Sequence, residues 1–226
     1  MNASRCRRLY CQIFAIALVA GMIQLGPLGA LAEQDAKDGW VNLLDGGDLT
    51  TNFTTAGNWI LDKEGVVALV PRKGESGWTR YGSYLWAKKQ YKDFEADFEY
   101  KVAKGGNSGF YFHVGDVKDP VTKGIEVQIY DSFSRGKDAK LNDHDSGGII
   151  PGIPPTKNTA KAPGEWNRMQ VTCKAGKVVV LLNGEVVNDV PLDHAKIKTR
   201  PLTGAIGFQD HGLPLWLRNI KMKELP

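Results

Sequence analysis

Three adjacent side chains near the end of the chain, Gln209, Asp210 and His211, have the chemistry needed for proton transfer. They follow the apolar run 204–208 and come directly before Gly212. An imidazole titrates near neutral pH, and a neighbouring acid can hold its proton on one ring nitrogen. We therefore predict that His211 transfers a proton and that Asp210 fixes its tautomer. The alternative is a simple Asx turn with a locally satisfied histidine.

A second group of polar side chains alternates with apolar ones in two strand-like runs, 107–114 and 125–130. Successive side chains of a strand point to opposite faces of the sheet. One face then carries amides, carboxylates and aromatic rings, which suit a sugar because rings stack on its CH groups and forked polar groups bind its hydroxyls. The residues predicted on this face are Asn107, Tyr111, His113, Glu126 and Gln128.

Two other segments carry weaker signals. Residues 141–148 contain Asp143, His144 and Asp145, which could form either a metal-binding loop or a solvated one, but the spacing fails the calcium-loop pattern. The long proline-rich segment 149–167 resembles a functional lid, and Lys157 and Asn158 are its most chemical members.

The elements that must position these groups are predicted to be strands. From residue 39 onward, short runs rich in Val, Ile, Phe, Tyr and Trp alternate with period two and end at Gly, Asn, Asp or Pro. Asn183-Gly184 indicates a tight hairpin, and a phase shift near residues 218–219 indicates a β-bulge. The pattern predicts an all-β fold, a two-sheet antiparallel jelly-roll sandwich.

The N-terminal segment 1–32 is predicted to be a signal peptide. Three arginines precede an uncharged apolar run, and Ala30-Leu31-Ala32 supplies a small-x-small cleavage site. We expect a periplasmic or secreted protein with a flexible leader at 33–38, a single domain at 39–226 and no stable membrane anchor after cleavage. A retained N-terminal anchor is the alternative.

Cleavage would leave 26 basic and 25 acidic residues, so the basic isoelectric point of 8.8 does not indicate nucleic-acid binding. It would also leave Cys173 as the only cysteine, which excludes an intramolecular disulfide.

Several motifs, taken together, resemble the 3-keto-disaccharide hydrolase domain family. They are "GGNSGFYFHV", "GIEVQIYD", "TKNTAKAPGEWNRMQV", "LNGEVVNDV" and "GFQDHGLPLWLRNIKM", and the likeness runs from Gly39 to about Leu225. The resemblance implies a concanavalin A-like, or laminarinase-like, sandwich that cleaves glycosides oxidised to a ketone at C3. It also implies elimination chemistry, sometimes with a divalent metal ion, whose ligands the motifs do not identify.

The resemblance carries site roles over by motif. His113 stands where many members have arginine. The residues carried over by motif are Glu126, Gln128, Asp131, Lys157, Gln209, Asp210, His211 and Arg218. With the residues chosen from the strand pattern and the loops added, we predict as catalytic His211, Glu126, Asp210 and Lys157, and as substrate-binding Gln128, Asp131, Tyr111, His113, Asn107, Asn158, Gln209, Trp216 and Arg218.

The mechanism expected from this resemblance is proton abstraction at C2 followed by β-elimination at C1, with or without rehydration. His211 is the expected base and Glu126 the alternative base, while Lys157, Arg218 or a metal ion would stabilise the enolate. Two other readings remain open. A non-catalytic carbohydrate-binding module could have the same fold. An ordinary retaining glycosidase would need paired carboxyls about 5 Å apart, for which Glu126 and Asp131 are a shortened match.

Overall fold

The computed structural model describes residues 37–136 and 138–226 of the 226-residue chain. The predicted signal peptide and most of the predicted leader therefore lie outside the described residues. In the part of the chain that is described, no helix is long and apolar enough to cross a bilayer.

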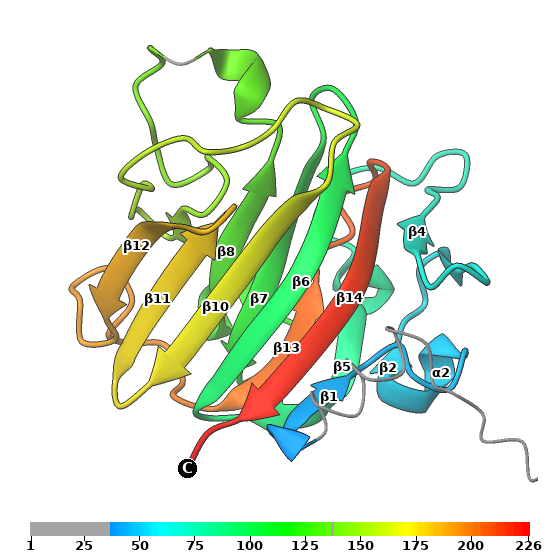
Figure 1. The fold of residues 1–226 in the computed structure, drawn as a ribbon, viewed down its shortest axis with the longest axis horizontal. Helices are drawn as coiled ribbons and strands as arrows, with labels where there is room; N and C mark the ends of the chain where they lie inside the picture. Colours follow the sequence, from blue (N-terminus) through cyan, green and yellow to red (C-terminus); the bar gives the residue numbers. More distant parts are fainter. Residues whose placement is uncertain (1–36, 137) are drawn as a thin grey trace, which may run out of the picture.

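Two antiparallel sheets pack face to face (Figure 1), which confirms the predicted all-β sandwich. The larger sheet runs in the order β12-β11-β10-β6-β14-β4-β3, with β1 paired to β14. Its strands are β1 (Trp40–Asn42), β3 (Trp59–Leu61), β4 (Val67–Leu69), β6 (Phe94–Val102), β10 (Asn167–Lys174), β11 (Lys177–Leu182), β12 (Glu185–Pro191) and β14 (Leu215–Glu224).

The smaller sheet runs in the order β2-β5-β13-β7-β8-β9. Its strands are β2 (Phe53–Thr54), β5 (Leu85–Tyr91), β7 (Asn107–Val114), β8 (Ile125–Tyr130), β9 (Ile149–Ile150) and β13 (Gly204–Phe208). The short helices are α2 (Leu49–Asn52), α3 (Pro120–Lys123), η1 (Tyr81–Ser83) and η2 (Phe133–Arg135).

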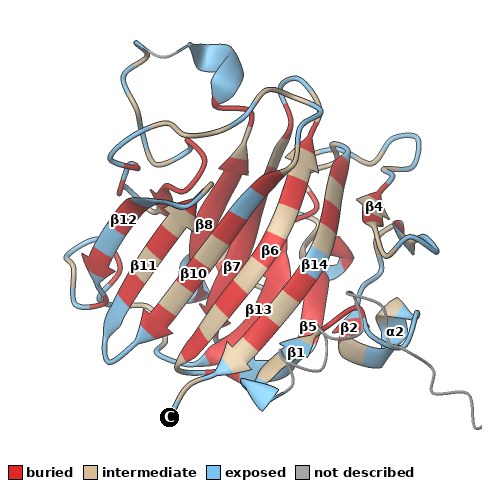
Figure 2. Cartoon of the chain, viewed as in Figure 1, coloured by how far each residue is buried: buried red, intermediate tan, exposed pale blue. Residues whose placement is uncertain are grey.

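The core lies between the sheets and follows from the period-two pattern. Along β6, buried residues alternate with partly exposed ones, which appears in Figure 2 as stripes. Three phenylalanines from β6, β7 and β13 meet at the centre: the ring centroid of Phe98 lies 5.1 Å from that of Phe110 and 5.0 Å from that of Phe208. Such aromatic pairs add to the free energy gained by burying apolar area.

Two local predictions about the backbone are confirmed. Asn183 and Gly184 both have positive φ, 54° and 85°, as a type I′ hairpin between β11 and β12 requires. In β14 the register shifts between Arg218 and Lys221, where Asn219 has φ 52°. That bulge lies in the larger sheet.

His113 does not lie on the predicted polar face. Its φ of 51° is left-handed, so the alternation of β7 is broken at this residue and the imidazole turns into the core. There Nε2 lies 2.6 Å from the Lys92 carbonyl oxygen and 3.8 Å from Cys173 Sγ, and the ring packs edge-on against Phe94. This position places His113 away from any ligand on the outer face.

Candidate active site

A cavity of about 210 Å³ opens on the outer face of the smaller sheet, the face turned away from the core. Strands β7 and β8 form its floor, and the loops before η1, after β8 and after β13 form its walls. The residues that line it are Trp78, Asn107, Tyr111, Val121, Glu126, Gln128, His144, Ile150, Gln209 and His211.

Strand register places the floor residues beside one another. Tyr111 of β7 pairs with Glu126 of β8, and Gly109 pairs with Gln128. A Cβ atom on Gly109 would overlap the Glu126 carboxylate, so the absence of a side chain there lets the carboxylate lie across β7. The alternation predicted for these two strands is confirmed up to Phe112.

Glu126 is a buried carboxyl group with few partners. Its side chain is almost inaccessible, the residue being 6% exposed, and Oε2 accepts a hydrogen bond from the Tyr111 hydroxyl at 2.6 Å. Burial raises the pKa of Glu126 to about 7, the hydrogen bond from Tyr111 opposes that rise, and the negative charge of Asp143 adds to it. The carboxyl group is therefore partly protonated at neutral pH.

Two tyrosines position the carboxyl group: Tyr111 by its hydrogen bond, and Tyr84 by packing against Tyr111. Tyr84 is fully buried, donates its hydroxyl to the Trp78 carbonyl at 2.7 Å and packs against Tyr111 with ring centroids 5.7 Å apart. Its ring stacks on Trp86 with centroids 5.4 Å apart. Burial raises the pKa of both phenols well above their ordinary value, so both stay protonated as hydrogen-bond donors.

The turn that follows β13 brings His211 into the cavity. The backbone amide of Gln209 donates to the Gly109 backbone carbonyl at 2.9 Å, and Ser108 Oγ donates to the backbone carbonyl of Gln209 at 2.8 Å. These bonds join the turn to β7. His211 is half-buried, and burial lowers the pKa of its imidazole, while the charge of Asp210 partly opposes that change. The imidazole is therefore neutral at pH 7.

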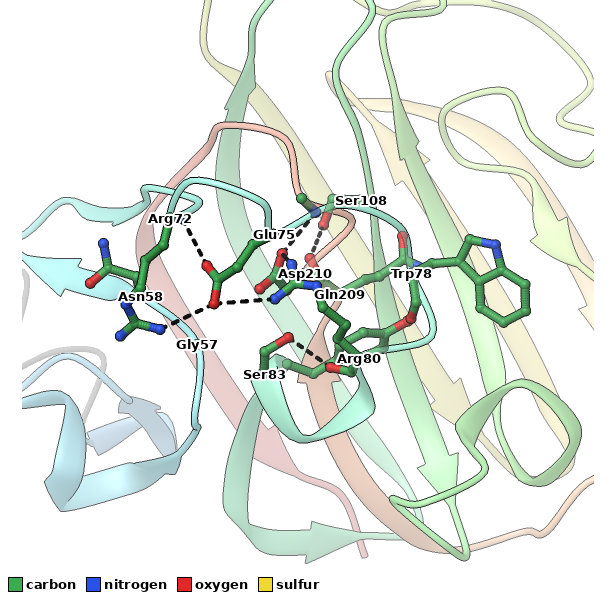
Figure 3. Close-up of polar contacts among 12 residues, drawn as sticks. Gly57, Asn58, Arg72, Glu75, Trp78, Arg80, Ser83, Ser108, Gln209 and Asp210 are labelled. Carbon is green, nitrogen blue, oxygen red and sulfur yellow. Dashed lines mark hydrogen bonds and ion pairs between the residues drawn. The ribbon is translucent and has the colours of Figure 1, made fainter.

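Asp210 lies in this turn but faces a different partner from the one predicted. Its fully buried carboxylate accepts hydrogen bonds from Arg80 Nη2 at 2.7 Å and from the Gly212 amide at 2.8 Å (Figure 3). The Asx turn offered as an alternative is present. No hydrogen bond between the Asp210 carboxylate and the His211 ring is found within the described residues.

Three residues expected at the site lie elsewhere, because their segments belong to other surfaces. Lys157 Nζ pairs with Glu185 at 2.5 Å on the exposed side of the long loop. Arg218 and Trp216 belong to β14, in the sheet on the far side of the core. There Arg218 Nε pairs with Glu99 at 2.9 Å. The predicted convergence of Lys157 and Arg218 with Glu126 is therefore absent.

Two further predicted residues have structural partners outside the cavity lining. The buried Asp131 carboxylate accepts hydrogen bonds from the backbone amides of Gly105 at 2.8 Å and Ser134 at 3.1 Å, which joins the turn between β6 and β7 to the turn after β8. Asn158 donates to the Ser132 carbonyl at 2.8 Å and thereby fastens the long loop.

Trp78, Val121 and Ile150 line the cavity but were not predicted from the sequence. They lie in a loop, in the one-turn helix α3 and in the two-residue strand β9, and such short segments carry no period that assigns a face. His144 was noticed only as part of a metal-loop hypothesis. Within residues 37–136 and 138–226, no group of three or more His, Cys, Asp or Glu side chains could hold a metal ion. In that loop Asp143 bonds to the His144 ring at 2.9 Å and Asp145 pairs with Arg135. The His, Cys, Asp and Glu side chains of the described residues therefore do not fit a metal centre.

The raised pKa of Glu126 predicts a pH-dependent stability. A group whose pKa is raised on folding stabilises the fold fully below its unfolded value of 4.5, and this contribution is lost as the pH rises through about 7. Glu126→Gln removes this titration. The unfolding free energy of the variant minus that of wild type should therefore be about 3 kcal/mol more favourable to the variant at pH 8 than at pH 4. Urea unfolding at both pH values measures this difference. An equal difference at the two pH values would contradict the assignment.

The fold and the cavity define a two-sheet antiparallel β-sandwich with a carboxyl group and an imidazole in one cavity. Comparison with known proteins agrees: the chain belongs to the 3-keto-α-glucoside-1,2-lyase-like domain family, which matches residues 39–223. This result confirms the resemblance drawn from the sequence motifs.

Individual relatives give the same picture. A 3-keto-disaccharide hydrolase of Bacteroides thetaiotaomicron is 31% identical over an alignment of 182 residues that covers 64% of this chain and 62% of the relative. The chain therefore spans less than two thirds of that protein. A candidate glycosyl hydrolase of Parabacteroides distasonis superimposes with a TM-score of 0.69 at 27% identity, covering 82% of this chain and 99% of that one. A carbohydrate-binding module of Bacillus subtilis shares the fold at 12% identity and a TM-score of 0.50, covering 82% of this chain and 96% of the module.

Proposed function

We propose that this protein is a carbohydrate-active enzyme that cleaves 3-keto-glycosides by elimination. The observation that carries the proposal is the presence of Glu126 and His211 in the lining of one cavity, reached from β8 and from the turn after β13. The family of the chain and the name of its relative from Bacteroides thetaiotaomicron support the choice of substrate.

The chemistry follows from the ketone. A carbonyl at C3 acidifies the hydrogen on C2, because the electron pair left behind delocalises into an enolate. The C2–H bond breaks first, and the enolate then expels the oxygen substituent on C1 and forms a C1–C2 double bond. The leaving oxygen needs a proton, and water can add to the product later, which would give net hydrolysis. One base and one acid are therefore required.

Burial assigns these two roles. His211 is neutral at pH 7 because burial lowers the pKa of its imidazole, and Glu126 retains its proton to about pH 7 because burial raises its pKa. Environments that push two pKa values in opposite directions separate base from acid. His211 is then the base that takes the C2 proton, and Glu126 is the acid that protonates the leaving oxygen.

Neutral donors take the place of the cations expected for the enolate. Lys157 and Arg218 are engaged with Glu185 and Glu99. The side-chain amides of Asn107, Gln128 and Gln209 line the cavity and are the groups available to the C3 oxygen. Preorganised neutral donors can stabilise a developing oxyanion in a site that excludes water. All proposed steps use side chains of the protein itself.

A binding module is the second candidate, because Trp78 stands at the cavity with 41% of its surface exposed, as a stacking platform would. The test is incubation of residues 33–226 with a 3-keto-glucoside and with its unoxidised parent. Release of the aglycone from the oxidised substrate alone supports the enzyme. Saturable binding of both sugars without turnover would overturn it and support the module.

We also propose that the protein acts outside the cytoplasm after removal of residues 1–32. The basic start, the apolar run and the Ala30-Leu31-Ala32 site support this proposal. N-terminal sequencing of the exported protein should find Glu33 first. A protein that keeps residues 1–32 in a membrane fraction would support the retained anchor instead.

A further inference from the structure

We propose that the ion pair between Arg80 and Asp210 is a clasp that positions the Trp78 loop against the His211 turn. In this view both charged residues are positioning residues, and Asp210 does not act on the His211 imidazole. The proposal concerns the same cavity, so its catalytic consequence rests on the proposed function. Its structural consequence can be measured without any substrate.

The pair joins segments that are 130 residues apart in the sequence. Arg80 Nη2 donates to Asp210 Oδ1 at 2.7 Å, and the same oxygen accepts the Gly212 amide at 2.8 Å. The Asp210 side chain is fully buried and that of Arg80 is 26% exposed. A buried carboxylate that loses its cationic partner is strongly destabilised, so the turn depends on Arg80 to keep its conformation.

The loop on the other side of the clasp is folded around one carboxylate. Glu75 accepts the Arg72 backbone amide at 2.7 Å, and its second oxygen lies 3.2 Å from the Arg72 guanidinium and 3.6 Å from Arg80 Nη1 (Figure 3). Ser83 Oγ donates to the Arg80 carbonyl at 2.7 Å. Arg80 therefore connects an ordered loop, which carries Trp78, to the turn.

The turn and the loop are also in direct contact. Gly212 has φ 77°, and a Cβ atom there would lie 2.6 Å from Ser76 Cα and 3.0 Å from the Glu75 carbonyl oxygen. This close approach leaves no room for a side chain between the two segments. Any movement of the loop away from the turn would therefore change the distance between Trp78 and His211, both of which line the cavity.

The catalytic test compares Asp210→Asn, Arg80→Gln and the double variant on a 3-keto-disaccharide. Asn keeps the oxygen that accepts the Gly212 amide but removes the charge. Misplacing a reacting group by about 1 Å can cost roughly 10²-fold, so each single variant should lose up to that factor in kcat/KM. The double variant should lose no more than either single one, because one contact is broken in all three. Arg80→Lys should recover part of the loss in both kcat and KM.

A direct action of Asp210 on the imidazole gives a different result. Asp210→Asn would then lower kcat far more than Arg80→Gln, and the two losses would add. That outcome would overturn the clasp. Arg168→Gln is the matched control, because it breaks an arginine–aspartate pair with Asp97 on the outer face of the larger sheet. It should change neither kcat nor KM.

The structural test uses trypsin on the native protein. The loop contains the cleavage sites Arg72 and Lys73, and local opening governs the cleavage rate. Asp210→Asn and Arg80→Gln should each be cut there about tenfold faster than wild type, which corresponds to about 1.4 kcal/mol less for opening. Arg168→Gln should match wild type. Unchanged cleavage in the first two variants would overturn the clasp even if the protein had no activity on 3-keto-glycosides.

Discussion

Glu126→Gln should lower kcat/KM for a 3-keto-disaccharide by about 10²–10⁴-fold, the contribution of a well-placed general acid. The amide keeps an oxygen for the Tyr111 hydroxyl, so the cavity retains its hydrogen bond while losing the proton that the leaving oxygen needs. In wild type, kcat/KM should fall as the pH rises through about 7, because only the protonated carboxyl group can act. Steady-state rates across pH 5–9 measure both effects.

A change of leaving group separates the acid from the base. A 4-nitrophenyl 3-keto-glucoside expels a stable anion and hardly needs an acid, so Glu126→Gln should slow its cleavage far less than that of the disaccharide. Equal losses for both substrates would instead make Glu126 the base. Glu99→Gln, which alters a carboxylate on the outer face of the larger sheet, should leave both rates unchanged.

Most of the fold could be predicted because its determinants are local in the sequence. Period-two alternation assigned the core face of β6 and β8, and Asn183-Gly184 identified a hairpin whose backbone needs two left-handed residues. The error at His113 has the same origin. A single left-handed residue reverses the face of its side chain, and nothing in the alternation of Phe110 and Phe112 announces it.

The site was less predictable because it depends on which sheet each strand joins. Glu126, Gln128 and Tyr111 were placed together correctly, since β7 and β8 are neighbours. Arg218 was placed with them by motif, but its strand β14 pairs with β6 in the larger sheet, which lies on the other side of the core. Loop partners are harder still: the Arg80–Asp210 pair joins two segments that carry no strand pattern, so only the three-dimensional structure reveals it.

His211→Ala should abolish proton abstraction and lower kcat/KM by about 10²–10⁴-fold for the disaccharide and the 4-nitrophenyl substrate alike. The lowered pKa of His211 keeps the imidazole neutral below the ordinary value of 6.5, so wild-type activity should persist into mildly acidic solution and fall only below that lowered pKa. Exchange of the C2 hydrogen in deuterated water, followed by NMR, reports the step directly and should disappear in the variant.

The matched control for this prediction is His144→Ala, because both histidines line the cavity. The His144 side chain is exposed and its ring is hydrogen-bonded to Asp143, so we do not expect this imidazole to remove the proton from C2. Its loss should leave C2 exchange close to the wild-type rate. If His144→Ala stopped the exchange and His211→Ala did not, the base would be His144, on the loop after β8, and the assignment of His211 as the base would be wrong.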